Sequence, residues 1–386
     1  MRGFKLNRVP AAVVGPGRMA ELGADVTASV GGPATVLLVA DPGLAPLGIT
    51  GRAANALAGG GHRVHLFEDI TGDPEESQVV SGATRAWNSK AHVVVGLGGG
   101  SALDVAKMIA VAAVADRSIE DYRLAAQPLP ARRVRLICVP TTAGTGSEAT
   151  AVAILSSADH TKYWFWGDPL KPDLIVLDPE LTVGLPAQLT AATGIDALVH
   201  AMEAATNRNS NPGNDLYALS AIEVAVGYLP KAVARPDSLD ARVRMLLAAS
   251  AAGVAIDNAG TALAHNIAHA LGSLTPIHHG RAVAIAMAAT LPFVIAGNRD
   301  GFARVAKAFG LATPDALPGR FAALLDEIGL DRSLPRAVDA KALAARMAAP
   351  ENAAMLASTA RDISPADLEM LAETVLASAK SASEAA

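Results

Sequence analysis

The character of the sequence changes near residue 186, and this change constrains the fold more than any other feature. Before it, short apolar runs rich in β-branched residues alternate with segments long enough for helices. The runs are TVLLVAD (35–41), RVHLFED (63–69), HVVVGLGG (92–99), VRLICVPTT (134–142), VAILS and DLIVLDP (173–179). Such continuous runs are typical of strands buried on both faces of a parallel sheet. We therefore expect an α/β, Rossmann-like domain over residues 1–186.

After residue 186 the β-branched runs disappear. The rest of the sequence is rich in alanine and leucine at helical spacing, as in LTAATGIDALVHAMEAAT and ARVRMLLAASAAGVAI. Breakers at 207–214 and 312–320 separate the segments. The pattern predicts an all-α domain over residues 187–386, and two domains suit a chain of 386 residues.

Composition excludes several classes of partner. The net charge is −5, no basic tract is present and aromatic residues make up 4%, so nucleic acid is not an expected partner. The longest apolar stretch, 282–297, is shorter than the roughly 20 residues of a membrane-spanning helix and contains Pro292, so we expect a buried core helix. The N-terminus lacks the apolar region of a signal peptide, and the single cysteine, Cys138, lies in an apolar run. We expect a buried thiol and a cytoplasmic location, with no membrane partner.

A glycine-rich turn stands between a strand and a helix in VVVGLGGGSALDVAKMIA. Gly98, Gly99 and Gly100 would let backbone amides approach an anion, and Ser101 is expected to cap the helix that faces it. Ser101 replaces the last glycine of the usual dinucleotide motif. The turn therefore predicts a phosphate or pyrophosphate cradle, although an ordinary tight turn explains the glycines equally well.

A second turn follows the next predicted strand, in PTTAGTGSEAT (140–150). It offers the hydroxyls of Thr141, Thr142, Thr145 and Ser147. Because ligands bind at the carboxyl ends of parallel strands, both turns are expected to line one crevice. Asp41 ends an earlier strand, where it could accept ribose hydroxyls and disfavour a 2′-phosphate, or serve only as a turn residue before Pro42.

Histidine and aspartate residues in the second half suggest a metal site. Asp196 and His200 are four residues apart in GIDALVHAME, as are His265 and His269 in AHNIAHALGSLTPIHHG. Residues at this spacing point the same way on a helix. Either pair alone is explained by chance or by core packing, but together they suit a borderline divalent ion. A further ligand could be either His279 or its neighbour His278.

Four segments carry a family resemblance. GGGSALDVAK, PTTAGTGSEAT, GIDALVHAME and AHNIAHALGSLTPIHHG resemble, in this order, the signatures of the iron-containing (group III) alcohol dehydrogenases, and the resemblance covers nearly the whole chain. It implies a dinucleotide-binding α/β domain at 1–186, a helical metal-binding and catalytic domain at 187–386, and an active site between them.

The resemblance also assigns residues. The family's metal ligands fall on Asp196, His200, His265 and His279, because the family histidine is the one followed by glycine. His269 takes the place of a histidine near nicotinamide and substrate that is not a ligand. The cofactor positions fall on Asp41, Gly98, Gly99, Gly100, Ser101, Asp104, Thr141, Thr142, Thr145, Ser147, Lys162 and Leu181.

Within this set, Lys162 resembles the lysine that reaches the cofactor ribose, Asp41 the acidic residue that favours NAD over NADP, and Lys107 completes the first motif. Two features depart from the family. Asp73 stands where the family often has asparagine, and the aromatic run 164–166 beside Lys162 either shapes the cleft or only packs it.

The resemblance implies an NAD(H)-linked alcohol dehydrogenase or carbonyl reductase, which transfers hydride between a small alcohol or hydroxyacid and nicotinamide. The metal, expected to be Fe²⁺ although Zn²⁺ accepts the same ligands, would act as a Lewis acid, with His269 relaying the alcohol proton. A homodimer or larger homo-oligomer is also implied. Alternatives are a hydroxyacid–oxoacid transhydrogenase, a maleylacetate-reductase-like enzyme, a metal-dependent hydrolase and a catalytically silent NAD-binding protein. The sequence does not identify the substrate.

Overall fold

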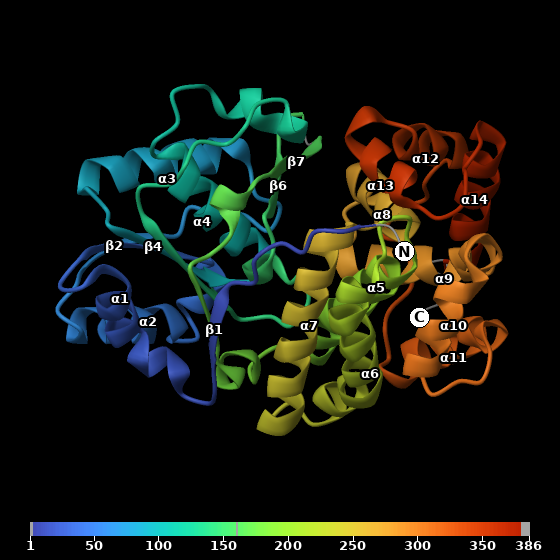
Figure 1. The fold of residues 1–386 in the computed structure, drawn as a ribbon, viewed down its shortest axis with the longest axis horizontal. Helices are drawn as coiled ribbons and strands as arrows, with labels where there is room; N and C mark the ends of the chain where they lie inside the picture. Colours follow the sequence, from blue (N-terminus) through green and yellow to red (C-terminus); the bar gives the residue numbers. More distant parts are fainter. Residues whose placement is uncertain (1–2, 160, 380–386) are drawn as a thin grey trace. The chain divides into compact units, whose positions relative to one another are not determined.

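The computed structural model describes residues 3–159 and 161–379. It forms two compact units (Figure 1). The α/β unit comprises Arg8–Thr142 and Gly146–Gly184, and the helical unit comprises Leu185–Ala386 together with Met1–Asn7 and Ala143–Thr145. The chain thus passes into the helical unit between Gly184 and Leu185, and the middle of the second glycine turn is grouped with that unit as well.

The α/β unit is built on a six-stranded parallel sheet with the order β1-β8-β5-β4-β2-β3. The strands are β1 (Ala11–Val14), β2 (Thr35–Ala40), β3 (Arg63–Phe67), β4 (Val93–Gly98), β5 (Arg135–Pro140) and β8 (Leu174–Leu177). All of them except β1 coincide with predicted runs, so the expected α/β class is confirmed. Consecutive strands β3 and β4 lie on opposite sides of β2, which makes the boundary between β2 and β4 the switch point of the sheet.

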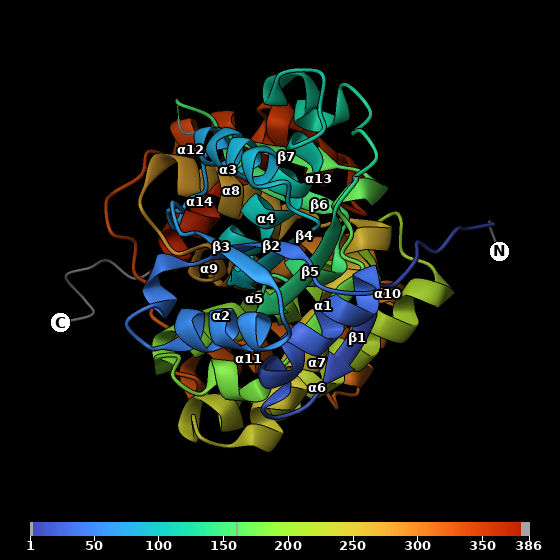
Figure 2. The same cartoon turned by 90° about the vertical axis from the view of Figure 1, so that its left-hand side faces the viewer.

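Helices cover both faces of this sheet (Figure 2). Val36 and Leu38 of β2 pack in one core cluster with α1 (Leu22–Val30) and α2 (Ile49–Gly59). Leu37 and Val39, which point the other way, pack with α3 (Glu76–Ser89) and α4 (Gly100–Ala112). Burial on both faces explains the continuous apolar runs. Cys138 on β5 is buried as expected, and burial raises the pKa of its thiol to about 12.

One predicted strand lies outside the sheet. VAILS forms β6 (Val152–Ser156), which pairs antiparallel with β7 (Lys162–Trp166) in a separate hairpin. Alternate residues of a strand face opposite sides. Phe165 is buried in the core of the α/β unit, whereas Trp166 is 50% exposed. The aromatic run therefore packs the core through Phe165 and leaves Trp166 accessible.

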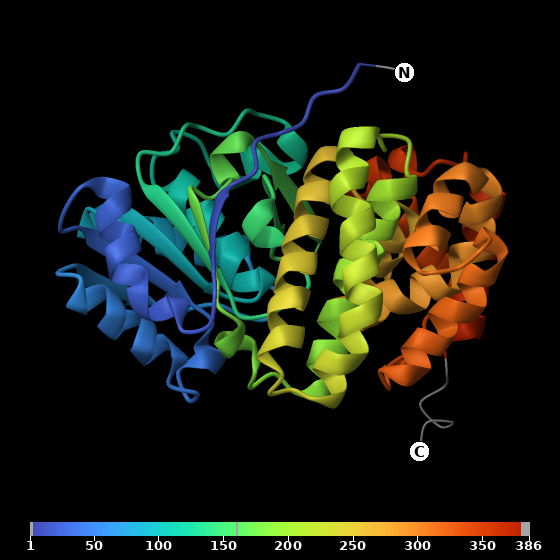
Figure 3. The ribbon, with the colours of Figure 1, turned by 60° about the horizontal axis from the view of Figure 1, so that its bottom comes forward.

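The helical unit has a single large core (Figure 3). Its helices are α5 (Ala187–Thr206), α6 (Pro212–Ala234), α7 (Leu239–Ala259), α8 (Leu263–Leu274), α9 (His279–Gly297), α10 (Arg299–Ala308), α11 (Leu317–Glu327), α12 (Ala340–Met347), α13 (Ala353–Ser358) and α14 (Pro365–Ser378). The all-α prediction is confirmed. Helix α5 is buried along nearly its whole length and packs against α6, α7 and α9. Polar side chains on α5 therefore lie inside the protein and need partners.

Two helices, α6 and α9, are long and apolar enough to cross a membrane by length and composition alone. Both contribute side chains to the core of the helical unit, and α9 contains the predicted core helix 282–297. Of the apolar window in each helix, 33% is buried in α6 and 56% in α9.

Candidate metal centre and cofactor-binding turns

Helix α5 supplies two of the four predicted metal ligands. Asp196 and His200 lie one helical turn apart and are both buried. His200 Nε2 is 4.0 Å from Asp196 Oδ1. The spacing read from the sequence therefore places both side chains on the same side of α5, facing the interior of the helical unit.

The other two ligands come from α8 and from the first residue of α9. His265 Nε2 lies 3.4 Å, and His279 Nε2 lies 3.6 Å, from the same oxygen of Asp196. The rings of His200 and His265 are stacked with 4.3 Å between their centroids. Three imidazole nitrogens thus lie within 4.0 Å of one carboxylate oxygen, and three of the four residues, Asp196, His265 and His279, form a group that could hold a metal ion.

This arrangement suits a divalent cation. Asp196 Oδ1 and His265 Nε2 are buried and have no hydrogen-bond partner within residues 3–159 and 161–379. Two ligand atoms that each lie about 2.1 Å from a tetrahedral cation are about 3.4 Å apart, close to the separations seen here. One carboxylate oxygen and three imidazole nitrogens are a donor set that Fe²⁺ and Zn²⁺ both accept.

The electrostatics of the cluster favour ligation. Burial raises the pKa of Asp196, but the surrounding histidines outweigh this effect and hold it below its usual value. Burial lowers the pKa of His200 to about 4, which leaves a neutral imidazole at neutral pH. Burial also lowers the pKa of His265, but the carboxylates of Glu203 and Asp196 outweigh burial and raise it to about 9. A cation at His265 Nε2 therefore competes with a proton.

Glu203 is a site residue that the sequence analysis missed. It lies on α5, is 3% exposed, and its Oε2 is 2.6 Å from His265 Nδ1. It also accepts hydrogen bonds from the amides of Ala262 and Ala264, at 2.7 and 2.6 Å. A carboxylate on Nδ1 orients the ring and leaves Nε2 for a metal. Its position seven residues after Asp196, on the same face of the helix, could have identified Glu203 from the sequence.

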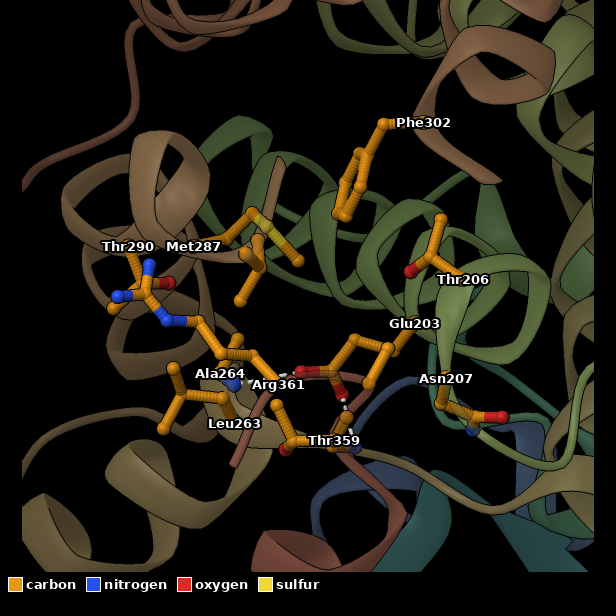
Figure 4. A pocket seen from close by; sticks show the side chains of 13 residues that line it. Glu203, Thr206, Asn207, Leu263, Ala264, Met287, Thr290, Phe302, Thr359 and Arg361 are labelled. Atoms are coloured by element: carbon orange, nitrogen blue, oxygen red, sulfur yellow. Dashed lines mark hydrogen bonds between the residues drawn. The ribbon is translucent and has the colours of Figure 1, made fainter. Parts of the chain in front are cut away.

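A small cavity lies beside Glu203 (Figure 4). Its volume of about 20 Å³ has room for one water molecule and not for an alcohol substrate. The walls include Thr206, Thr290 and Arg361. This cavity is therefore part of the surroundings of Glu203 and is not a substrate pocket.

The structure distinguishes the two adjacent histidines. The ring of His278 caps α9, because its Nδ1 accepts a hydrogen bond of 3.2 Å from the amide of Gly280. His279, one residue later, points to Asp196.

The start of α9 lies in close contact with α5. A Cβ on Gly280 would lie 2.0 Å from the carbonyl oxygen of Ala192 on α5, so only glycine lets α9 approach α5 this closely. His269 lies one turn after His265, with its ring edge-on to that of His279 at 5.5 Å.

The first glycine turn lies at the switch point of the sheet. The amide of Asp41 after β2 donates to Leu97 O, and that of Thr141 after β5 donates to Gly98 O, both at 3.0 Å. A Cβ on Gly98 would lie 2.7 Å from Ala102 Cβ and 3.0 Å from Asp41 Cβ. Asp41, Gly98, Gly99, Gly100, Thr141 and Thr142 are therefore gathered at the carboxyl edge of β2, β4 and β5.

The start of α4 can receive an anion. Gly99 is the N-cap residue and supplies no side-chain cap, so the first amides of α4 remain available. The prediction that Ser101 caps this helix is wrong. Ser101 lies inside the first turn, beyond the N-cap position, and its hydroxyl donates to Gly72 O at 2.9 Å.

The other predicted cofactor residues are more dispersed. Lys162 Nζ forms an ion pair of 2.9 Å with Asp73 Oδ1, and the Asp41 carboxylate accepts a hydrogen bond from the amide of Gly43. Leu181 is buried in a 3-10 turn after β8, and Asp104 and Ser147 are buried and hydrogen-bonded to each other. Thr145 belongs to the segment grouped with the helical unit, where Gly144 packs closely against Thr193 of α5.

Comparison with known proteins decides the family. Residues 10–179 match the model "Iron-containing alcohol dehydrogenase", and residues 190–376 match "Fe-containing alcohol dehydrogenase family, C-terminal". The chain belongs to the iron-containing alcohol dehydrogenase family. The family resemblance inferred from the four sequence motifs is confirmed.

Individual relatives agree with this assignment. A choline dehydrogenase of Bacillus subtilis is 36% identical over 317 residues, covering 81% of this chain and 78% of the relative. An NAD-dependent methanol dehydrogenase of Bacillus methanolicus is 34% identical, covering 78% of each chain. The crystal structure of a sulfoacetaldehyde reductase from Bifidobacterium kashiwanohense with NAD⁺ superposes with a TM-score of 0.88 at 27% identity, covering 97% of this chain and 99% of the other.

These matches establish the general activity. This protein is an alcohol dehydrogenase linked to NAD and to a metal. The substrates in the names of these three relatives differ in charge: choline is cationic, methanol is neutral and sulfoacetaldehyde is anionic. Family membership therefore leaves the substrate of this alcohol dehydrogenase open.

We expect the contact between Glu203 and His265 to control metal affinity. Replacing Glu203 by glutamine removes the charge that orients the ring, so affinity should fall by about 10- to 100-fold. Competition with a chromogenic chelator measures the affinity. Glu223→Gln, at an exposed position of α6, is the matched control. A Glu203→Gln protein that folds and binds metal like the wild type would contradict this role.

Proposed function

We propose that this enzyme interconverts a small alcohol or hydroxyacid and its carbonyl compound at a metal held by Asp196, His200, His265 and His279. The observation that carries the proposal is the convergence of three imidazole nitrogens within 4.0 Å of one buried carboxylate oxygen. A bound Fe²⁺ or Zn²⁺ would supply Lewis acidity toward the substrate oxygen, and NAD would accept or return the hydride. The four side chains hold that charge in a fixed place within the helical unit.

His269 is the proposed proton carrier. It follows His265 by one turn on α8, and its ring lies edge-on to that of His279, with 5.5 Å between the ring centroids. Imidazole can accept and donate a proton near neutral pH. His269 would take the alcohol proton during oxidation and return it during reduction, while His265 and His279 hold the metal.

The activity itself is tested with purified protein. We expect NADH to form with at least one member of a panel of alcohols and hydroxyacids, and its absorbance to measure the rate. Chelator should abolish the rate, and Fe²⁺ or Zn²⁺ should restore it, because the ligands are of a kind that both ions accept. No NADH with any member of the panel, or a rate unaffected by chelator, would refute the proposal.

The division of labour among the histidines is tested by two alanine variants. His265→Ala should lose metal and activity together, because it removes a buried ligand. His269→Ala should keep the metal but turn over about 10²- to 10⁴-fold more slowly, the range typical for loss of an acid–base group. Metal content by elemental analysis and kcat separate the two effects. Loss of metal from His269→Ala would show that this residue is a ligand and not a proton carrier.

Asp41 is proposed to select NAD over NADP. It follows β2 at the switch point, where a carboxylate would accept ribose hydroxyls and repel a 2′-phosphate. Asp41→Asn keeps an acceptor for the amide of Gly43 but removes the charge. It should raise kcat/KM with NADP relative to NAD by about tenfold or more. Asp69→Asn, at an exposed carboxylate just after β3, is the control. An unchanged ratio would show that Asp41 is only a turn residue.

Homo-oligomeric assembly and a cytoplasmic location remain part of the proposal. The edge strand β1 pairs with β8 on one side; its last residue, Val14, is 43% exposed, and Val9 just before the strand is 46% exposed. An exposed edge with apolar side chains favours pairing with another chain. The buried thiol of Cys138 suits a reducing compartment.

A further inference from the structure

A buried lysine lies inside the α/β unit. Lys107 on α4 is 0% exposed, and its ammonium group donates to Ser147 O at 2.9 Å and to the hydroxyls of Ser147 and Thr150 at 3.1 Å each. It also contacts the carbonyl oxygen of Val152. An ammonium has three protons to donate, so its hydrogen-bonding capacity is fully used by one segment of chain.

Asp104 binds the same segment. Its Oδ1 lies 3.7 Å from Lys107 Nζ and accepts a hydrogen bond from the hydroxyl of Ser147, while its Oδ2 accepts one of 2.9 Å from the amide of Ile154. A buried charge is costly unless it is paired and hydrogen-bonded, and here both conditions are met. The ion pair thus fastens residues 147–154 to α4 at several points.

The two elements joined in this way are those that follow the two glycine turns. Helix α4 begins at the first turn, and residues 147–154 comprise the end of the second turn (140–150) and the chain that follows it. At about 1.5 Å per residue, Lys107 lies about 10 Å along the helix from its first residue, Gly100. Because Lys107 is also fully buried, it is remote from any ligand at the N-terminus of α4.

We propose that Asp104 and Lys107 are positioning residues, which hold the chain after the second turn against α4 so that both turns are formed before the cofactor binds. This inference rests on the proposed role of the turns in binding NAD. A preformed site avoids the entropy cost of ordering a loop on binding. The pair contacts the backbone at Ser147, Val152 and Ile154. In this proposal Asp104 positions the chain, in place of the direct cofactor contact that the family resemblance implied.

The test uses a double variant. Either single substitution would leave a buried charge unpaired, so Asp104→Asn is combined with Lys107→Met. In the cofactor-free protein, hydrogen exchange of the amides at 147–154 should become faster. The dissociation constant of NADH, from fluorescence titration, should rise by about tenfold or more if preorganisation carries this binding. Metal content should be unchanged, because neither residue is among the four proposed metal ligands.

A second buried lysine provides the control. Lys171 lies in the same unit, is 1% exposed, and donates to Arg8 O at 2.7 Å. Lys171→Met also removes a buried ammonium, but neither exchange at 147–154 nor NADH binding should change. If the double variant does not fold, Thr150→Val removes one hydroxyl that accepts from Lys107, together with that hydroxyl's contacts to the backbone of Ser147 and Val152. It should shift both measurements in the same direction by about threefold.

Each remaining outcome contradicts the inference. Weaker NADH binding with unchanged exchange would show that the pair contacts the cofactor directly. Faster exchange with unchanged binding would show that the order of this segment is irrelevant to the cofactor. If the proposed function itself is wrong, the result differs from all of these, because the wild-type protein would then neither bind NADH nor reduce NAD.

Discussion

The helical unit is organised around a buried negative charge. Asp196 lies in the middle of α5, a helix with almost no solvent contact, where an isolated carboxylate would be costly. Imidazoles from α5, α8 and α9 surround it, and a cation bound there would balance its charge. The packing of these three helices thus creates the candidate metal site. The close contact of Gly280 with α5 shows how far the backbone is adapted to bring His279 into place.

The α/β unit follows the same principle in another form. The first glycine turn leaves backbone amides accessible at the carboxyl edge of the sheet, which suits a pyrophosphate. Behind them, the Asp104–Lys107 pair binds the chain that follows the second turn. Each unit thus contains a buried charged group with several partners: Asp196 in the helical unit and the Asp104–Lys107 pair in the α/β unit. In our proposal, each group holds the surrounding elements in the arrangement that the metal or the cofactor requires.

Much of the fold could be predicted because its signals are local. The strands β2, β4 and β5 are buried on both faces and therefore read as continuous apolar runs. Strand β1 was missed because it is short and mostly exposed at the sheet edge, and β7 because its aromatic run resembled a pocket. Ser101 was misassigned as a cap because its role depends on where α4 begins, which differs by two residues from the expected position.

By itself the sequence determined the α/β and all-α halves, the two glycine turns and a set of four candidate metal ligands. These follow from periodicity and from motifs of a few residues. Only the tertiary structure joined Glu203 to His265 and placed Lys107 against residues 147–152. The physical reason is distance along the chain. Glu203 and His265 are 62 positions apart, and no local pattern specifies a contact that arises only when α5 and α8 pack together.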